Sequence, residues 1–288
     1  MPATVVSPQC GFARNQSEAE YPRLWNCLAG LWSPGVNPRG GVFLRDWGVK
    51  ANHGTLTTMD PATDWATSSG YSSLDFDGTS DYVDLGTGAG VTFTTAMSIS
   101  VWFLVNTFAG VNDDYQLLSR DGNTGGRSYT FDVNHPTTGS ALNKLRFYVN
   151  GGAGSDAIFG STTSLAAGVI YHAVATYRAG SLNLYLDGKS DATEVTGATN
   201  PIPTATASAR IGSRQYTGAE GYAPMKLFEA ALWSRALSGS EIRTIYQLGP
   251  GGIFTPRRRR VVAAQTAAAT FQAAWARNSN TLISPTVV

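Results

Sequence analysis

Short apolar runs, alternating or continuous, recur along the chain with Gly, Asn, Asp and Ser between them. Such runs predict β-strands, because successive strand side chains point to opposite faces and these polar residues favour turns. Asn150-Gly-Gly and Asp187-Gly188 follow two of the runs and predict tight reversals, since these turns need a positive φ. The expected strands are Leu28–Pro34, Ser73–Phe76, Tyr82–Leu85, Met97–Val105, Tyr115–Ser119, Tyr129–Val133, Lys144–Val149, Ile170–Tyr177, Ser181–Leu186, Ser208–Ile211 and Met225–Trp233.

The expected fold class is all-β, an antiparallel sandwich. Ten or more short strands without intervening amphipathic helices exclude a βαβ fold, and 288 residues fit one large β-domain with appendages. Asn52–Leu56 is predicted to begin a turn and Met59–Gly70 to form a loop. The expected organisation is an N-terminal arm over residues 1–21, a sandwich over 22–249 and a C-terminal tail over 250–288.

A single short helix is expected near the end of the sandwich. Ser238 can cap it, and Glu241 lies three residues further on as the capping-box partner. Its apolar stripe should lie against the edge of the sandwich, and Gly249–Gly252 is predicted to be a flexible hinge. The stripe consists of Ile242, Ile245, Tyr246 and Leu248.

Charge is low and unevenly placed. Charged residues make up 14% and the net charge is +1, yet from Gly249 to Val288 there are five arginines and no Asp, Glu or Lys. The rest of the chain therefore carries −4, the difference between +1 and those five. This balance disfavours whole-molecule attraction to nucleic acid or to an anionic membrane. Cys10 and Cys27 either close one loop or stay reduced as small apolar side chains.

Several strings along the chain resemble the laminin-G-like domains of the concanavalin A-like lectin and glucanase superfamily. The resemblance runs from Leu28 to Leu248 in the order expected for such domains. It implies a jelly-roll sandwich that binds glycans or proteins and requires no cofactor. The matching strings are Asn52–Leu56, Leu74–Val83, Met97–Trp102, His172–Tyr177, Leu182–Lys189, Ala209–Gly212 and Leu232–Ile242.

Many domains of this kind hold a structural Ca²⁺, so the resemblance raises the question of a metal site. Asp75, Asp77, Asp81 and Asp84 cluster around one predicted turn. Calcium takes six to eight oxygen ligands, which such a cluster could supply in part. The alternative is that these aspartates shape turns through side-chain to backbone hydrogen bonds.

Catalysis is not expected. Glycosidases need two carboxylates flanking the scissile bond, and no Glu-x-Asp-x-x-Glu strand motif is present. The acidic residues inside predicted strands are Asp75, Asp84, Asp132 and Glu229, of which Glu229 is expected to face outward or to be paired. Tyr115, Tyr216 and Tyr222 are placed in loops and are candidates for a sugar-binding platform, although each could instead pack locally.

The basic, apolar C-terminal tail has three interpretations: a solvated tail, a nucleic-acid patch, or a segment that docks on a partner. Docking is favoured, because aromatic residues and arginine are typical interface anchors and Phe271 and Trp275 have helical spacing. The candidate docking residues are Arg257, Arg258, Arg259, Arg260, Phe271, Trp275, Arg277, Leu282 and Ile283.

The layout of body and tail also resembles virion proteins of tailed bacteriophages and prophages. The residues that carry this likeness are Gly252–Arg260 and Trp275–Asn280, after the laminin-G-like body. It implies a non-enzymatic capsid-decoration or tail-associated protein, anchored by its termini, that contacts other virion proteins, copies of itself and weakly a host glycan. The alternatives are a free carbohydrate-binding module or cell-surface adhesion domain and, more remotely, a glycoside hydrolase.

Localisation follows from the same layout. The start, Met1–Gln9, lacks the basic and apolar regions of a signal peptide, and no apolar run is long enough to span a bilayer. We therefore expect synthesis in a host cytoplasm and assembly into a virion, with no membrane partner.

Overall fold

A computed structural model describes residues 21–254. Short stretches within this range lie outside the description, and so do the expected arm up to residue 20 and the tail from residue 255 onward. The internal stretches are 38–39, 109–112, 123–125, 136–142, 151–155, 180, 193–194, 197–200, 217 and 219.

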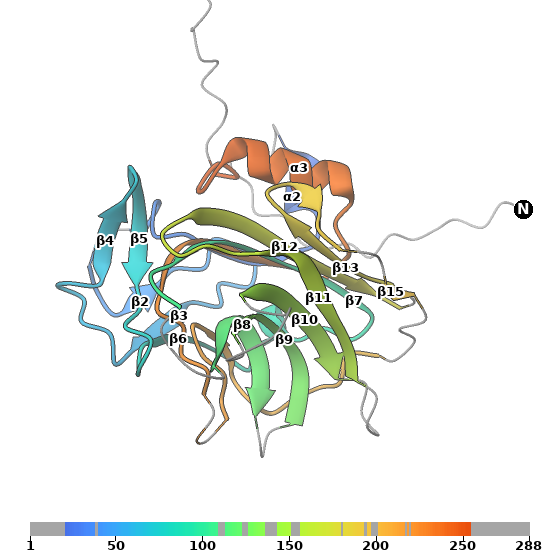
Figure 1. Ribbon diagram of the computed structural model, residues 1–288, viewed down its shortest axis with the longest axis horizontal. Helices are drawn as coiled ribbons and strands as arrows, with labels where there is room; N and C mark the ends of the chain where they lie inside the picture. Colours follow the sequence, from blue (N-terminus) through green and yellow to red (C-terminus); the bar gives the residue numbers. More distant parts are fainter. Residues whose placement is uncertain are drawn as a thin grey trace, which may run out of the picture.

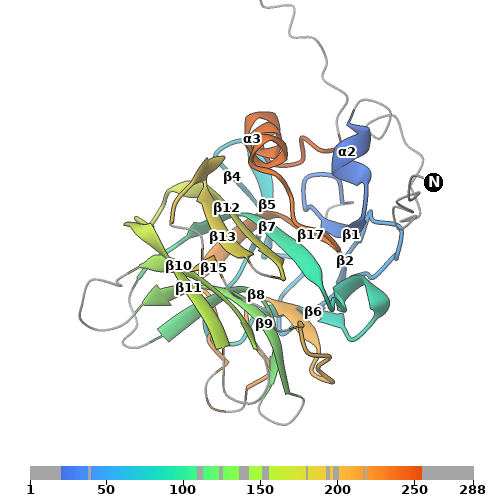
Figure 2. The ribbon, with the colours of Figure 1, turned by 90° about the vertical axis from the view of Figure 1, so that its right-hand side faces the viewer.

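Two antiparallel sheets pack face to face, which confirms the predicted jelly-roll sandwich (Figures 1 and 2). The strands of the first sheet run in the order β14-β13-β12-β7-β17-β5-β4, with β1 beside β17 and β15 beside β13. They are β1 (Leu28–Trp32), β4 (Trp65–Ser68), β5 (Tyr71–Asp75), β7 (Ala96–Val105), β12 (Ile170–Arg178), β13 (Ser181–Leu186), β14 (Lys189–Ser190), β15 (Val195–Thr196) and β17 (Met225–Trp233).

The second sheet has the order β11-β10-β9-β8-β16-β6-β3-β2. Rings from β9 and β10 meet on its inner side, where Phe131 and Phe147 pack edge to face with centroids 6.1 Å apart. Its strands are β2 (Phe43–Leu44), β3 (Gly54–Thr57), β6 (Tyr82–Gly86), β8 (Asp113–Gly122), β9 (Gly126–His135), β10 (Lys144–Asn150), β11 (Asp156–Ser164) and β16 (Ala209–Ile211).

The central strands of the first sheet, β7 and β17, are buried on both faces. The inner face of this sheet meets the second sheet, and its outer face is covered by helices α2 (Pro22–Trp25) and α3 (Gly239–Leu248), as Figure 1 shows. Ile242 and Ile245 of α3 join Trp233 in a second apolar cluster on this outer face. Strand β7 is therefore buried nearly throughout, as its continuous apolar sequence predicted.

Helix α3 begins as predicted. Ser238 Oγ accepts a hydrogen bond from the Glu241 backbone N–H at 3.3 Å, and Glu241 Oε2 accepts one from the Ser238 N–H at 2.8 Å. Arg235 binds the same carboxylate at 2.8 Å and also donates to the carbonyl of Arg23, so the helix start is tied to α2. The described residues also include a 3₁₀ turn, η1 (Ala89–Val91). Of the helices in the described part of the chain, none has the length and apolar character needed to cross a membrane.

Two stretches predicted as irregular contain strands. The expected loop Met59–Gly70 includes β4, which forms a hairpin with β5 through Ser69 and Gly70, both at positive φ (51° and 83°). Such a two-residue reversal suits the twist of a hairpin. Asn52–Leu56, expected to be a turn, leads into β3, and β11 was not predicted. These strands lie at or near sheet edges, where the hydrophobic alternation that marks a strand is weak.

The expected hinge at Gly249–Gly252 is wrong. The Gly251 N–H donates to the Glu229 carboxylate at 2.8 Å, and Ile253 is fully buried. Phe254 packs edge to face against Trp25 and Trp47, with centroids 6.2 and 5.7 Å away. The chain therefore stays packed on the sandwich beyond the expected boundary at 249, because its two apolar side chains fill the space beside α2.

Of the two cysteines that could be either disulfide-bonded or reduced, the structure describes one. Cys27 precedes β1 and is disulfide-bonded. Cys10 lies outside the described residues.

Candidate functional site

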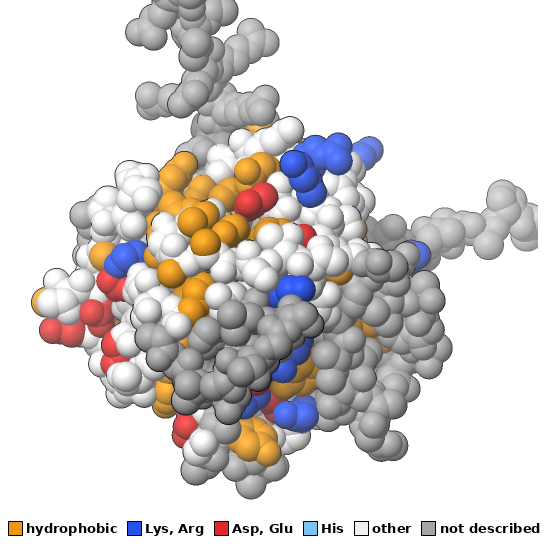
Figure 3. All heavy atoms as spheres, viewed as in Figure 1, with side chains coloured by type: hydrophobic (Ala, Val, Ile, Leu, Met, Phe, Trp, Pro, Cys, Tyr) orange, Lys and Arg blue, Asp and Glu red, His pale blue; other side chains and the backbone are white. Residues whose placement is uncertain are grey.

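An aromatic groove of about 440 Å³ opens on the outer face of the first sheet, beside the C-terminal half of α3. Figure 3 shows hydrophobic side chains gathered on this face below α3, with an acidic side chain among them. The residues that line the aromatic groove are Tyr71, Trp102, Ile170, Asp187, Tyr246, Gln247 and Pro250.

Three aromatic rings line the groove, those of Tyr71, Trp102 and Tyr246. The planes of Trp102 and Tyr246 differ by 7° with centroids 5.7 Å apart, and His172 stacks on Trp102 at 4.6 Å. Tyr246 is 38% exposed and Tyr71 is 42% exposed, whereas Trp102 is only 6% exposed. The groove thus has two exposed rings and a third that is nearly covered.

Strand and helix periodicity place these rings. On β7 the neighbours of Trp102, Val101 and Phe103, belong to the core between the sheets, so Trp102 points to the opposite face. On α3 Tyr246 follows the buried Ile245 and stands at the margin of the helix face that contacts the sheet. Tyr71 follows the Ser-Gly reversal at the start of β5.

Two polar side chains line the aromatic groove. Asp187 sits at the β13–β14 turn with a positive φ of 49°, and its Oδ1 accepts the His172 backbone N–H at 2.9 Å. Burial raises the pKa of Asp187, and the hydrogen bond from His172 acts against that rise. Gln247 is exposed on α3. The groove therefore offers acceptor and donor groups next to flat apolar rings.

Glu229 lies under this face. The register between β17 and β7 shifts between Leu227 and Glu229, which places Glu229 opposite Trp102. Its side chain is 1% exposed, Oε2 accepts the Gly251 N–H, and Oε1 has no partner among the described residues. Burial raises the pKa of Glu229 to about 8, although the hydrogen bond from Gly251 opposes the shift. The expectation of an outward-facing or paired carboxylate is wrong, because the segment after α3 covers it.

The predicted sugar-binding tyrosines do not line the aromatic groove. Tyr115 is in β8, not in a loop, and is only 3% exposed within the core, so that assignment is corrected. Tyr216 is half-buried under the Arg214 guanidinium at 5.3 Å, and Tyr222 packs against Tyr82 at 6.5 Å. Both lie in the connection from β16 to β17, which contacts the second sheet: Tyr82 belongs to β6, and the Gln215 N–H donates to the carbonyl of Asp121 in β8.

The four aspartates do not form a joint metal site. Asp75 is bound by Lys226 and by Asn106, and Asp84 Oδ1 accepts the Gly86 N–H at 2.7 Å. Within the described residues, no group of three or more His, Cys, Asp or Glu side chains is placed to hold a metal ion. The arrangement does not fit a calcium cage built from these four side chains.

The other two aspartates shape their turn. Burial acts to raise the pKa of Asp77, but hydrogen bonds from Thr79, Ser80 and Asp81 hold that pKa well below its usual range. Asp81 in turn accepts the Asp77 N–H at 3.0 Å. These bonds are those of the turn-shaping alternative.

Buried carboxylates also lie on the outer side of the second sheet, where they are held by arginines. Both Asp132 oxygens bind Arg146, at 3.0 and 2.9 Å. Burial raises the pKa of Asp132 to about 6 and Arg146 opposes the rise, so Asp132 is ionised at neutral pH. Asp121 accepts from Arg127 and from the Tyr148 hydroxyl, each at 3.2 Å. Asp132 and Asp121 therefore act as hydrogen-bond acceptors for side chains of the second sheet.

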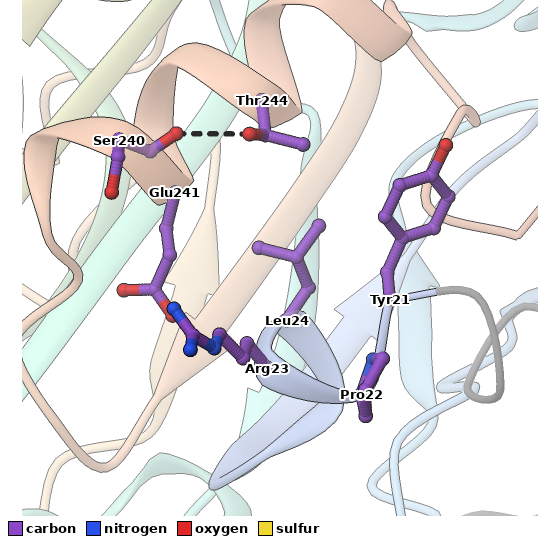
Figure 4. Close-up of a pocket in the computed structure, with 7 residues that line it drawn as sticks. All are labelled: Tyr21, Pro22, Arg23, Leu24, Ser240, Glu241 and Thr244. Atoms are coloured by element: carbon purple, nitrogen blue, oxygen red, sulfur yellow. Dashed lines mark hydrogen bonds between the residues drawn. The ribbon is translucent and has the colours of Figure 1, made fainter.

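A smaller hollow of about 340 Å³ separates α2 from α3 (Figure 4). Glu241 and Arg23 approach one another on one side of it, and Tyr21 stands on the other. Glu241 is already bound by Arg235 and by the helix cap, so the polar groups here serve the contact between the helices.

The predicted docking residues lie outside the described residues. They are Arg257, Arg258, Arg259, Arg260, Phe271, Trp275, Arg277, Leu282 and Ile283.

Comparison with known proteins gives a consistent family and fold. A laminin-G-type family model described as "Concanavalin A-like lectin/glucanases superfamily" matches residues 77–243, more than half of the chain. Among curated proteins, none matches the sequence.

Three similar solved structures can be compared directly. The binding domain of Paraclostridial Mosquitocidal Protein 1 is 13% identical with a TM-score of 0.57, over 77% of this chain and 52% of that domain. The receptor binding domain of botulinum neurotoxin C/D mosaic serotype is 11% identical with a TM-score of 0.56, over 77% and 51%. A mutant Trypanosoma rangeli sialidase with trans-sialidase activity is 17% identical with a TM-score of 0.53, over 80% and 34%.

The chain thus spans about half of each toxin domain and about a third of the sialidase. At these identities the likeness is one of fold.

Proposed function

This chain belongs to the concanavalin A-like lectin/glucanase superfamily, and from that premise we propose that it is a carbohydrate-binding protein whose binding site is the aromatic groove. The observation that carries the proposal is the pair of exposed rings, Tyr71 and Tyr246, that line one hollow together with the nearly covered Trp102.

The chemistry of the groove suits a sugar. A pyranose ring has an apolar C–H face that gains from covering an aromatic ring, because both surfaces leave water. Its hydroxyls need hydrogen-bond partners at the edges, and Asp187 and Gln247 stand there. A hollow of about 440 Å³ lies within the roughly 300–1,000 Å³ common for small-molecule sites. Two of the similar structures are binding domains, which also supports a binding role.

The first prediction tests the groove with its exposed rings. Replacement of Tyr246 or Tyr71 by Ala should weaken oligosaccharide binding about tenfold each, because a lost aromatic contact with its buried area is worth roughly 1–2 kcal/mol. A glycan array identifies the ligand, and titration calorimetry measures the change. The matched control is Tyr216→Ala, which removes a half-buried tyrosine on the side of the second sheet.

Three outcomes would contradict the proposal. They are absence of binding by the unaltered protein, equal losses in Tyr216→Ala and Tyr246→Ala, and loss of self-association in Tyr246→Ala with binding unchanged. The last would identify the aromatic groove as a contact between copies of the chain.

We also propose that the sandwich is the exposed part of a virion protein held by its terminal segments. In its favour, both ends of the described chain leave the sandwich close together, since Phe254 contacts Trp25 of α2 with centroids 6.2 Å apart. One anchoring surface could therefore take both ends. Sedimentation of particles from a lysate tests this idea: the protein should travel with them, and its recovery only in the soluble fraction would argue for the free binding module.

A further inference from the structure

Charge is distributed unevenly around the aromatic groove. Of its lining residues only Asp187 carries a formal charge, and no Lys or Arg of the described chain is among them. In Figure 3 the basic side chains on this face lie outside the hydrophobic patch. A site that captures a carboxylate or sulfate ordinarily presents arginine or lysine to it.

The nearest elements bring no cation into the hollow. Lys226 of β17 is bound to Asp75 at the far end of β5. Lys189 follows Asp187 by two residues on β14 and its charge acts to lower the pKa of Asp187, but its side chain is exposed and is not among the lining residues. Arg243, one turn before Tyr246 on α3, is also exposed outside the lining. Arg178, at the other end of β12, lines a separate hollow near Ser238.

The Asp187 carboxylate is held in place. Its Oδ1 is bound to the His172 N–H, and the backbone at this Asp-Gly turn is fixed by the β13–β14 pairing. Its second oxygen, Oδ2, accepts no hydrogen bond from the described residues, so it is available to a sugar hydroxyl. A fixed acceptor of this kind suits a neutral polyol and repels a second anion.

A second acidic group lies under the same surface. Glu229 is opposite Trp102, is 1% exposed and forms no ion pair with a described residue. The raised pKa of Glu229 keeps this carboxyl group protonated at neutral pH, so the charged acidic group that an anion in the aromatic groove would meet is Asp187. The charged group of such a ligand would lose bound water without gaining a cationic partner among the lining residues, which disfavours its binding.

We propose that the aromatic groove selects uncharged sugars and discriminates against sugars that bear a carboxylate or a sulfate. This inference rests on the proposed function of the groove and names its ligand class. A negative charge on the sugar about 5 Å from the Asp187 carboxylate, in a partly screened site, should weaken binding about tenfold or more relative to the neutral sugar.

The test compares matched ligands. A neutral oligosaccharide that the protein binds on an array is titrated beside the same oligosaccharide with one terminal sialic acid or one sulfate. We expect the neutral form to bind at least about tenfold more tightly. Asp187→Asn should narrow the ratio of the two affinities, because removal of the carboxylate charge favours the anionic form, while asparagine keeps an acceptor for the His172 N–H.

Two further variants complete the design. Gln247→Glu adds a negative charge at an exposed position of α3, where a substitution should not disturb folding. It should increase the preference for the neutral sugar over the anionic one. Glu220→Gln removes one charge from the loop beside the second sheet and should leave the ratio unchanged.

The outcomes separate this inference from the function on which it rests. Equal or tighter binding of the anionic sugar, with sensitivity to Tyr246→Ala retained, would overturn the selectivity but leave the groove as a sugar site. A ratio that neither Asp187→Asn nor Gln247→Glu changes would also overturn it. Loss of all sugar binding in the unaltered protein would remove the proposed function itself.

Discussion

At the scale of single residues, Glu229 combines a buried carboxyl group with a structural contact. Its Oε2 holds the Gly251 N–H at 2.8 Å, which fixes the start of the segment that ends in Ile253 and Phe254. Burial raises the folded-state pKa to about 8 from an ordinary value of 4.5. The protonated form therefore predominates below that value, and ionisation would leave a buried charge without a partner.

This shift predicts a pH dependence of stability. The folded state holds a proton that the unfolded chain has released between pH 4.5 and 8. The contribution of Glu229 is therefore fully present below about pH 4.5 and is lost as pH rises through about 8, by up to about 1.4 kcal/mol per pH unit.

Glu229→Gln, which keeps an acceptor for Gly251, should flatten the fall in the free energy of unfolding between pH 5 and 9. Urea unfolding at several pH values measures this, with Glu220→Gln as the control for loss of a half-buried carboxylate. Parallel pH profiles for the Glu229→Gln variant and the unaltered protein would show that Glu229 does not titrate as described.

At the scale of elements, helix α3 contributes both to the cover of the first sheet and to the aromatic groove. Its capping box satisfies N–H groups at its start, while Ile242 and Ile245 fasten it to the sheet. Tyr246 and Gln247 reach the groove only because the helix is held in this position.

Ser238→Ala should lower the free energy of unfolding by about 1 kcal/mol, because the N–H of Glu241 loses its cap. Chemical denaturation checks this value. Thr244→Ala also removes a hydroxyl from α3, one that bonds only to the preceding turn, and should change stability by less than about 0.5 kcal/mol. A loss from Thr244→Ala as large as that from Ser238→Ala would show that the cap is not the cause.

At the scale of the whole molecule, the packed body extends further than composition indicated. Removal of residues 255–288 should leave the melting temperature nearly unchanged, because the described body retains Ile253 and Phe254. Removal from residue 250 should destabilise it by roughly 4 kcal/mol or more, since one fully buried side chain and one packed between two tryptophans are lost. Differential scanning calorimetry compares the two truncations.

Equal melting temperatures for both truncations would mean that the contacts of Ile253 and Phe254 contribute nothing to the fold. Particle sedimentation of the 255–288 deletion then tests anchoring separately from folding. Its release from particles as a folded protein is the expected result.

The sequence by itself determined what depends on near neighbours. Alternating or continuous apolar runs located the main strands, among them Ser181–Leu186 and Met225–Trp233 with the observed bounds, and the Ser238–Glu241 spacing located the helix start. Edge strands such as β4 were not predicted, because a short edge strand buries few side chains and needs little apolar alternation.

Only the tertiary structure decided the candidate site. Tyr71, Trp102 and Tyr246 are far apart in the chain, and no local pattern indicates that their rings meet in one groove. The same holds for Tyr115, which lies in the core, and for Glu229, which a bulge and a returning segment bury. The burial of a side chain and its proximity to others depend on which distant elements pack together, and the local periodicity of the sequence does not indicate that packing.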